Sequence, residues 1–373
     1  MTPNALPLPV ELLLMIIRHL SHRDMLSTLQ TCQSMRRIVE TRLYMHLLTP
    51  FDDLRMVKLL RTLHTRPDLA HNIITFDGSL YPALQKPRFP RVVTPTSLVK
   101  NWYQRWSMIR RERTLSHMTV TSILHMVNVR SLTLRDFRWL KTTSAQTLIS
   151  HAICSTVSLP SLTSLTIHGS DFRPETKPNY VIQLSLILRY QPFLERLELR
   201  SGEWDLERWI FPTDLPRLTH LMSGPEEAKV LVPGRPITSL ALRKLSVVPR
   251  MDVWVALTTS TSPIHALKVD VLQHDVLLSI LHFISSHLQD VEDLTLNGPT
   301  YETLPLLTQG FPSLPSLRIL HVTLWVHLGC EMESVCTTLR EGRRADLVTR
   351  LRSECPEFKS LDYRDRGCLD LDF

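Results

Sequence analysis

Glycine is scarce in this sequence, which has 10 glycines against 25 prolines in 373 residues. The two closest glycines, Gly224 and Gly234, are ten positions apart. The dinucleotide fingerprint G-x-G-x-x-G and the phosphate loop G-x-x-x-x-G-K-[ST] therefore cannot occur. The hydrolase elbow G-x-S-x-G is absent as well. These absences argue against enzymes that hold a nucleotide or an activated serine on a glycine-rich backbone.

The six cysteines form no C-x-x-C motif and have no histidines at the spacing of zinc ligands. No apolar run approaches the 18 residues of a membrane span. The first apolar run follows Glu11 and has no cationic segment before it, unlike a secretory signal. We therefore expect an intracellular protein of the cytoplasm, the nucleus or both, with cysteines as small core residues, no metal and no other cofactor.

Charge is distributed unevenly along the chain, although the net charge is only +7. Residues 1–130 contain 18 Lys and Arg against 8 Asp and Glu, whereas residues 131–373 contain 25 against 28. A basic first part and a nearly neutral second part suggest that the two parts have different partners.

Near the start, six consecutive apolar residues run from Leu12 to Ile17. Pro9 suits a first helical position, and six apolar residues cover more than one turn, so the predicted helix is apolar nearly all round. Ser21 predicts the cap of a second helix, and apolar spacing predicts a third from about Cys32 to Leu47. Three short helices cannot cover their own apolar surface, which must meet the rest of the chain or another protein.

The order of residue types over positions 6–48 resembles an F-box. The matching residues are L-P-V-E-L from Leu8 to Leu12, Ile16, Leu20, Asp24-Met25-Leu26, Leu29, Cys32 and Arg36. In that family the trihelical motif docks on a Skp-type adaptor and joins a cullin–RING ubiquitin ligase. The resemblance implies that the adaptor contacts are Leu8, Pro9, Leu12, Ile16, Leu20 and Leu26. It departs from the family at Met35, where an aromatic residue is usual.

From residue 129 onwards an apolar-x-x-Leu-x-apolar pattern recurs nine times. Its fourth position is always leucine, at Leu132, Leu165, Leu197, Leu221, Leu240, Leu267, Leu294, Leu320 and Leu361. The sixth position is apolar in every copy except the one with Ser223. The intervals of 19 to 41 residues leave room for a strand, a turn and usually a helix. Helical spacing is visible over 179–190, 275–287 and 331–352.

One strand and one helix in each repeat of this length are typical of leucine-rich repeats. The chain thus resembles F-box proteins with irregular leucine-rich repeats of the fungal type. The predicted α/β fold has a trihelical F-box at 4–50, a linker with a degenerate first repeat at 51–128, and a leucine-rich-repeat solenoid at 129–373. Its parallel strands would line the inner face, with helices outside. The asparagine of regular repeats is missing, so the hydrogen bonds between repeats are not predicted.

Side chains alternate along a strand, so the residues beside the fourth and sixth positions point away from the core. Among them, Arg135, His168 and Arg200 fall at related positions in three successive copies. With Glu198, they are the predicted target-binding residues, because arginine pairs well with carboxylate and phosphate. The alternative is that the mixed charges only solvate the sheet.

The segment between the two parts contains a predicted strand at Ile73–Phe76 and a predicted helix at 94–113. That helix places Trp102, Tyr103 and Trp106 beside basic residues, a pattern that also occurs in nucleic-acid binding. A solvated basic face with the aromatic residues in the core is the other interpretation. No recognised nucleic-acid motif accompanies the pattern.

These features favour a substrate-recognition subunit of an SCF-type ubiquitin ligase. The F-box would bind the adaptor, the repeats would bind an unknown target protein, and the chain itself would not be an enzyme. A ligase-independent scaffold and, less favoured, a basic nucleic-acid-associated protein are the alternatives. No membrane association is expected.

Overall fold

The computed structural model of the chain describes residues 8–48, 53–79, 118, 121–135, 159–168, 188–200, 206–208, 210–245, 250–271, 274–298, 313–326 and 345–367. The chain divides into two compact units, Met1–Phe193 and Leu194–Phe373. Each unit contains parallel strands and accompanying helices. The predicted helix at 94–113 lies outside the described residues.

The first unit begins with three helices, and two more helices and four strands follow among its described residues. Its helices are α1 (Val10–Arg18), α2 (His22–Thr28), α3 (Gln33–Met45), α4 (Asp53–Thr65) and α5 (Pro67–His71). Its strands are β1 (His46–Leu48), β2 (Thr75–Ser79), β3 (Ser131–Arg135) and β4 (Ser164–Ile167), in that order across the sheet. A further helical stretch spans 121–125.

The three N-terminal helices form the predicted trihelical arrangement. Pro9 is the N-cap of α1 rather than its first residue. At α2 the Ser21 hydroxyl accepts a hydrogen bond from the Asp24 backbone N–H, which satisfies one free donor of the first turn. Cys32, expected in the core, is exposed and caps α3, where its sulfur accepts from the backbone N–H of Met35.

The third helix leads directly into the sheet. The sequence predicts helix up to Leu47, but α3 ends at Met45 and the next three residues form β1. This strand pairs in parallel with β2, with His46 opposite Thr75. The Ile74 N–H also donates to the carbonyl of Met45 at 2.9 Å. The pairing explains the correction, because a strand partner 29 residues away overrides the local helical pattern.

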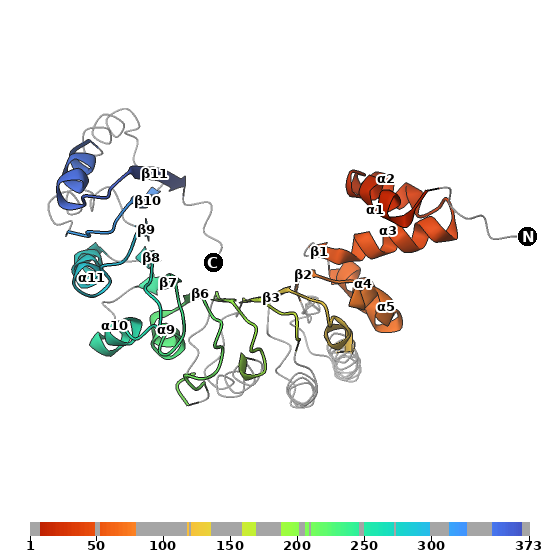
Figure 1. The fold of residues 1–373 in the computed structure, drawn as a ribbon, viewed down its shortest axis with the longest axis horizontal. Coiled ribbons are helices and arrows are strands. Elements are labelled where there is room, and N and C mark those ends of the chain that lie inside the picture. Colours follow the sequence, from red (N-terminus) through yellow and green to blue (C-terminus); the bar gives the residue numbers. More distant parts are fainter. Residues whose placement is uncertain are drawn as a thin grey trace, which may run out of the picture. The chain divides into compact units, whose positions relative to one another are not determined.

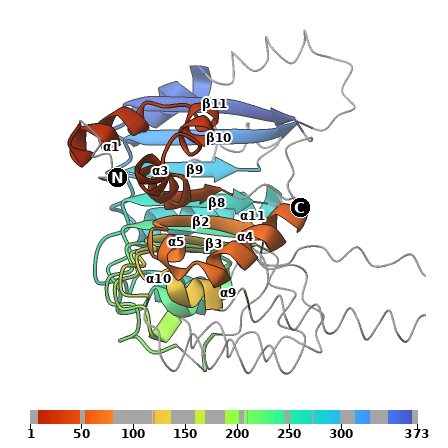
Figure 2. The same ribbon diagram turned by 90° about the vertical axis from the view of Figure 1, so that its right-hand side faces the viewer.

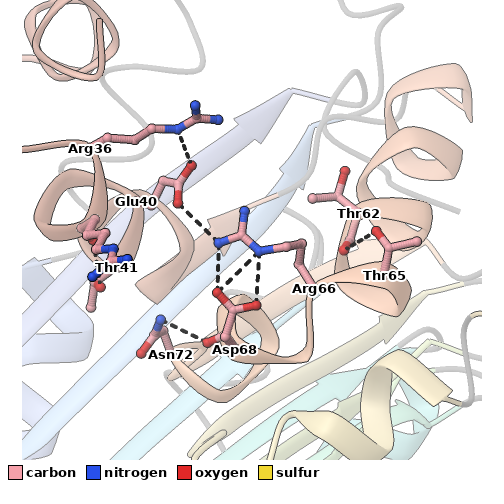
Figure 3. A network of polar contacts seen from close by, with 9 residues as sticks. Arg36, Glu40, Thr41, Thr62, Thr65, Arg66, Asp68 and Asn72 are labelled. Carbon is pink, nitrogen blue, oxygen red and sulfur yellow. Dashed lines mark hydrogen bonds and ion pairs between the residues drawn. The ribbon is translucent and has the colours of Figure 1, made fainter. Parts of the chain in front are cut away.

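Charged groups add a second link between α3 and the segment after it (Figure 3). Arg66, between α4 and α5, lies 3.3 Å from the carboxylate of Glu40 on α3 and 2.7 Å from that of Asp68 on α5. Arg36 approaches Glu40 at 3.0 Å. Hydrogen bonding to Arg66 lowers the pKa of the Asp68 carboxyl. These partly exposed pairs add little stability, so strand pairing is the stronger link.

The strand predicted at Ile73–Phe76 begins two residues later, as β2 (Thr75–Ser79). Its Phe76 lies opposite Leu132 of β3, which in turn lies opposite Leu165 of β4. All three side chains are buried. β2, from the predicted linker, therefore continues the same apolar row as the predicted repeats.

The described residues of the second unit form seven strands, three helices and one further helical stretch. The strands are β5 (Arg196–Leu199), β6 (His220–Ser223), β7 (Ser239–Leu245), β8 (Ala266–Val271), β9 (Asp293–Asn297), β10 (Ile319–Val326) and β11 (Ser360–Gly367). The helices are α9 (Pro225–Leu231), α10 (Met251–Leu257) and α11 (His274–His287). Residues 345–354 are also helical.

All nine predicted copies of the apolar pattern are strands. In the second unit the strand order follows the sequence, every pairing is parallel, and the fourth-position leucines lie opposite one another from β5 to β11. Figure 2 shows β8 to β11 running side by side. These leucines are buried, except for Leu361 in the last strand, which is half-buried. The polar exception at the sixth position, Ser223, is buried and donates to the Gly224 carbonyl.

The helices of the second unit lie on one side of its strands (Figure 1). The helix predicted over 275–287 is confirmed as α11, with Val276, Leu277 and Ile280 buried. The rings of Trp254 on α10 and Phe283 on α11 are stacked, with their centroids 4.3 Å apart, and this contact joins the two adjacent helices. The burial of one face by helices leaves the other face of these strands without a described helix.

Side-chain hydrogen bonds between successive strands come from the residue just before a strand, a position that the sequence did not predict to be important. Thr163, Thr219 and Thr238 each precede a strand, and their hydroxyls donate to the carbonyls of Arg130, Glu195 and Thr219 at 3.2, 3.2 and 3.4 Å. In the later strands, charged side chains occupy this position. Arg318 lies 2.8 Å from Glu292 and 2.9 Å from Glu357. These side chains link neighbouring strands or the segments next to them.

We predict that Thr219→Val lowers the free energy of unfolding by about 1–2 kcal/mol, because the hydroxyl loses its bond to the Glu195 carbonyl and its 2.8 Å contact with Nδ1 of His220. Urea unfolding followed by circular dichroism measures the change. Thr219→Ser, which keeps the hydroxyl, is the matched control and should stay close to wild type. A loss in Thr219→Ser without a loss in Thr219→Val would mean that the methyl group, not the hydroxyl, stabilises this position.

Candidate functional site

The N-terminal helices present a large apolar surface to solvent. Leu12, Met15 and Ile16 of α1 are 46%, 56% and 50% exposed. Leu8, Pro9 and Leu14 are exposed as well, and so is Leu26 of α2. A cluster of exposed apolar side chains of this kind marks a surface that binds another protein. We call these residues, with the half-buried Leu20, the apolar face.

The fold of α1 explains why this surface exists. Leu13 and Ile17, four residues apart, are buried on the side of α1 that packs on α3. Val39 of α3 is buried as well. With one side of the helix filled, the remaining apolar residues of the run have no room in this small bundle. Leu12 and Ile16 are also four residues apart, so they share the outer side.

Five of the six predicted adaptor contacts are exposed on or just before the N-terminal helices, and Leu20 is half-buried. Leu14 and Met15 of α1 are exposed as well but were absent from the predicted set. The unbroken apolar run contained the signal for them, since only one side of a helix can be buried at once. Glu11, Arg18, His19 and Arg23 are exposed near the apolar face and give it a polar rim.

The predicted target-binding residues lie in two units. Arg135 ends β3, and the backbone N–H of His168 donates to the carbonyl of Leu134 at 2.8 Å, so both fall at one level of the first unit. Glu198 and Arg200 belong to the second unit. There the Arg200 guanidinium donates two hydrogen bonds to the Glu198 carboxylate, at 3.0 and 2.9 Å. Pairing with Glu198 largely neutralises the predicted contribution of Arg200.

The side of the second-unit strands away from the buried leucines forms a polar surface, which we call the open face. Its residues are Arg196, Glu198, Arg200, His220, Met222, Ser239, Ala241, Arg243, Ala266, Lys268, Asp270, Asp293, Thr295, Asn297, His321 and Asp362. The alternation of buried and half-buried residues along β8 is typical of a sheet with one covered side.

Several charged groups on the open face are already paired. Arg243 donates to the carbonyl of Arg200 at 2.6 Å and lies 3.7 Å from Asp270. The Asn297 amide donates to Asp270 at 2.7 Å. His321 lies 3.2 Å from Asp362. The open face is thus a network of cross-strand contacts with a small number of unpaired charges.

Within the described ranges, no group of three or more His, Cys, Asp and Glu side chains is arranged to hold a metal ion. Among the same residues, no helix is both long and apolar enough to cross a bilayer.

Comparison with known families identifies the N-terminal helices. A family model described as F-box-like matches residues 6–49, which contain α1, α2, α3 and β1. A search of the curated proteins found no match to this chain. The F-box-like region therefore coincides with the helices that carry the apolar face.

Proposed function

We propose that this protein is the substrate-recognition subunit of an SCF-type cullin–RING ubiquitin ligase. The F-box-like helices bind a Skp-type adaptor through the apolar face, and the strand–helix units of residues 129–373, as irregular leucine-rich repeats, bind the target. The chain contributes no catalytic group, since ubiquitin transfer belongs to the RING partner and its conjugating enzyme.

The exposed apolar face of α1 and α2 is the observation that carries this proposal. F-box domains generally bind Skp-type adaptors, and the F-box-like match covers the residues of this face. The face is also physically unfavourable in a free chain, because complete burial of such a side chain is worth about 1.5–3 kcal/mol and these side chains are about half exposed. An adaptor with a complementary apolar surface would recover much of that free energy.

The polar open face supports the second half of the proposal. Parallel strands stacked in sequence order give a continuous surface, and such surfaces are the usual binding side of solenoid proteins. This surface is distinct in character from the apolar face, so one chain offers two different kinds of interface. Two such interfaces are what a receptor needs to connect a ligase with its target.

We predict that Ile16→Asp weakens binding to a purified Skp-type adaptor by at least about 30-fold, equivalent to about 2 kcal/mol. The substitution places a carboxylate without a partner in an apolar interface. Titration calorimetry of the full chain with the adaptor measures the change. Ile16 is exposed in the free chain, so the thermal unfolding midpoint should move little.

Arg37→Asp on α3 is the matched control, because it adds the same carboxylate at an exposed position away from the α1 run. It should bind the adaptor like the wild type. Wild-type affinity in the Ile16→Asp variant would refute adaptor binding through the apolar face. Adaptor binding without recruitment of a cullin would instead support a scaffold that works outside the ligase.

A further inference from the structure

The β5 to β8 part of the open face has more positive than negative side chains. Arg196, Arg200, Arg243 and Lys268 stand there against Glu198 and Asp270. Arg200 is bonded to Glu198, and Arg243 lies beside Asp270. After these pairs are set aside, Arg196 and Lys268 supply the excess positive charge.

Neither of these two side chains makes an ion pair or hydrogen bond with any residue that the structure describes. The Lys268 side chain is nevertheless half-buried on β8, and the Arg196 side chain is exposed on β5, the first strand of the second unit. A half-buried ammonium group without an anion gains from acquiring one, because charge-assisted hydrogen bonds are stronger than neutral ones. We call Arg196 and Lys268 the cation pair.

The surface between the two cations consists of His220 and Met222 on β6 and of small side chains on β7 and β8. In register, Lys268 has Ala241 on one side and Thr295 on the other, and Ser239 and Ala266 lie one level below. His220, which lies opposite Arg196, has its pKa lowered by burial and then by Arg196. It is therefore neutral near pH 7. The small side chains on β7 and β8 let the backbone of a bound segment approach the sheet there.

The register also sets the separation of the cation pair. Arg196, His220, Ser239 and Ala266 lie opposite one another across four strands, and Lys268 is two residues beyond Ala266 on β8. Three strand spacings across the sheet and two residue steps along β8 are at right angles, so the diagonal between the two Cα atoms is about 16 Å. An extended peptide covers that distance in about five residues.

We propose that the cation pair binds an extended acidic segment of the target protein, with acidic groups about five residues apart. This inference rests on the proposed role of the open face as receptor surface and specifies what it receives. Lys268 and Arg196 each contact one acidic group, and the intervening backbone passes His220 and Met222 on β6 and lies on the small residues of β7 and β8. Carboxylates and phosphorylated side chains share this chemistry.

The test uses fluorescein-labelled peptides of about twelve residues in a Gly/Ser/Asn background, measured by anisotropy with the full chain at about 50 mM salt, where screening is weak. One peptide carries two glutamate pairs about five positions apart. A second has the same four glutamates in one block, a third has glutamine in their place, and a fourth has phosphoserine.

We expect the spaced peptide to bind most tightly of the glutamate peptides, and the glutamine peptide not to bind. Lys268→Ala and Arg196→Ala should each weaken binding by roughly five- to tenfold. Arg208→Ala removes an exposed cation from a turn outside the strands and should have no effect. Tighter binding of the phosphoserine peptide, also lost in Lys268→Ala, would support the proposal and identify a phosphorylated target.

Unchanged affinity in both cation-pair variants would overturn the proposal, as would binding of the glutamine peptide. A single-stranded oligonucleotide that outcompetes every peptide through the same two residues would also overturn it. Adaptor binding is measured on the same samples. If it is retained while acidic peptides fail, the receptor function stands and only this choice of target segment is wrong.

Discussion

Leu294→Ala is expected to lower the free energy of unfolding by about 2–5 kcal/mol. Leu294 occupies the fourth position of the pattern on β9 and is fully buried, opposite Leu267 on β8 and Leu320 on β10. The substitution leaves a cavity between neighbouring strands and removes contacts on both sides. Urea unfolding of the full chain, followed by far-UV circular dichroism, measures the loss.

Thr295→Ala is the matched control because it alters the next residue of the same strand, on the open face. Thr295 is half-buried, and its change should stay within about 0.5 kcal/mol of wild type. Similar losses in the two variants would contradict the register of β9, since residues one step apart must face opposite sides of a sheet.

The second large effect is expected at Arg235, which is fully buried in the second unit. Its guanidinium donates hydrogen bonds to four backbone carbonyls. They belong to Phe211 and Asp214 in the turn before β6, to Val230 in α9, and to Pro233 after that helix. One side chain thus holds together a turn and a helix end that are distant in sequence.

Arg235→Ala should lower the free energy of unfolding by about 3–5 kcal/mol, because four carbonyls lose their donor in a buried site. Arg235→Lys keeps the charge but has fewer donors in a different geometry, so an intermediate loss is expected. Burial lowers the pKa of Arg235 to about 10, which keeps it protonated near neutral pH. Its contribution should therefore be constant between about pH 6 and 8.

Urea unfolding of the two variants at these pH values checks the prediction, with the exposed Arg208→Ala as reference. A loss below about 1 kcal/mol in Arg235→Ala would show that water or a shift of the turn replaces the missing donors.

The strands of this protein could be predicted because their signal is local. A leucine at the fourth position and an apolar residue at the sixth face the same side of a strand. Each copy of the apolar pattern therefore predicts its own strand. β1 could not be predicted in this way. His46 to Leu48 continue the apolar spacing of α3, and they form a strand only because β2 lies beside them.

The candidate site was predictable to the same extent. The apolar run of α1 indicated an interface, but only the packing of Leu13 and Ile17 on α3 decides that Leu14 and Met15 are exposed. On the open face, the sequence could not show that Glu198 pairs with Arg200 while Lys268 has no described partner. Arg235 also went unnoticed, since its four acceptors meet only in the folded chain.

The direct passage from α3 into β1 has a practical consequence for deletion experiments. Removing the F-box-like helices together with β1 would strip the first strand from its sheet and leave the backbone groups of Thr75 to Asp77 on that side without partners. An unprotected strand edge readily pairs with other chains and promotes aggregation. A truncated protein would thus lose solubility as well as its N-terminal interface, whereas a point substitution such as Ile16→Asp keeps β2 covered.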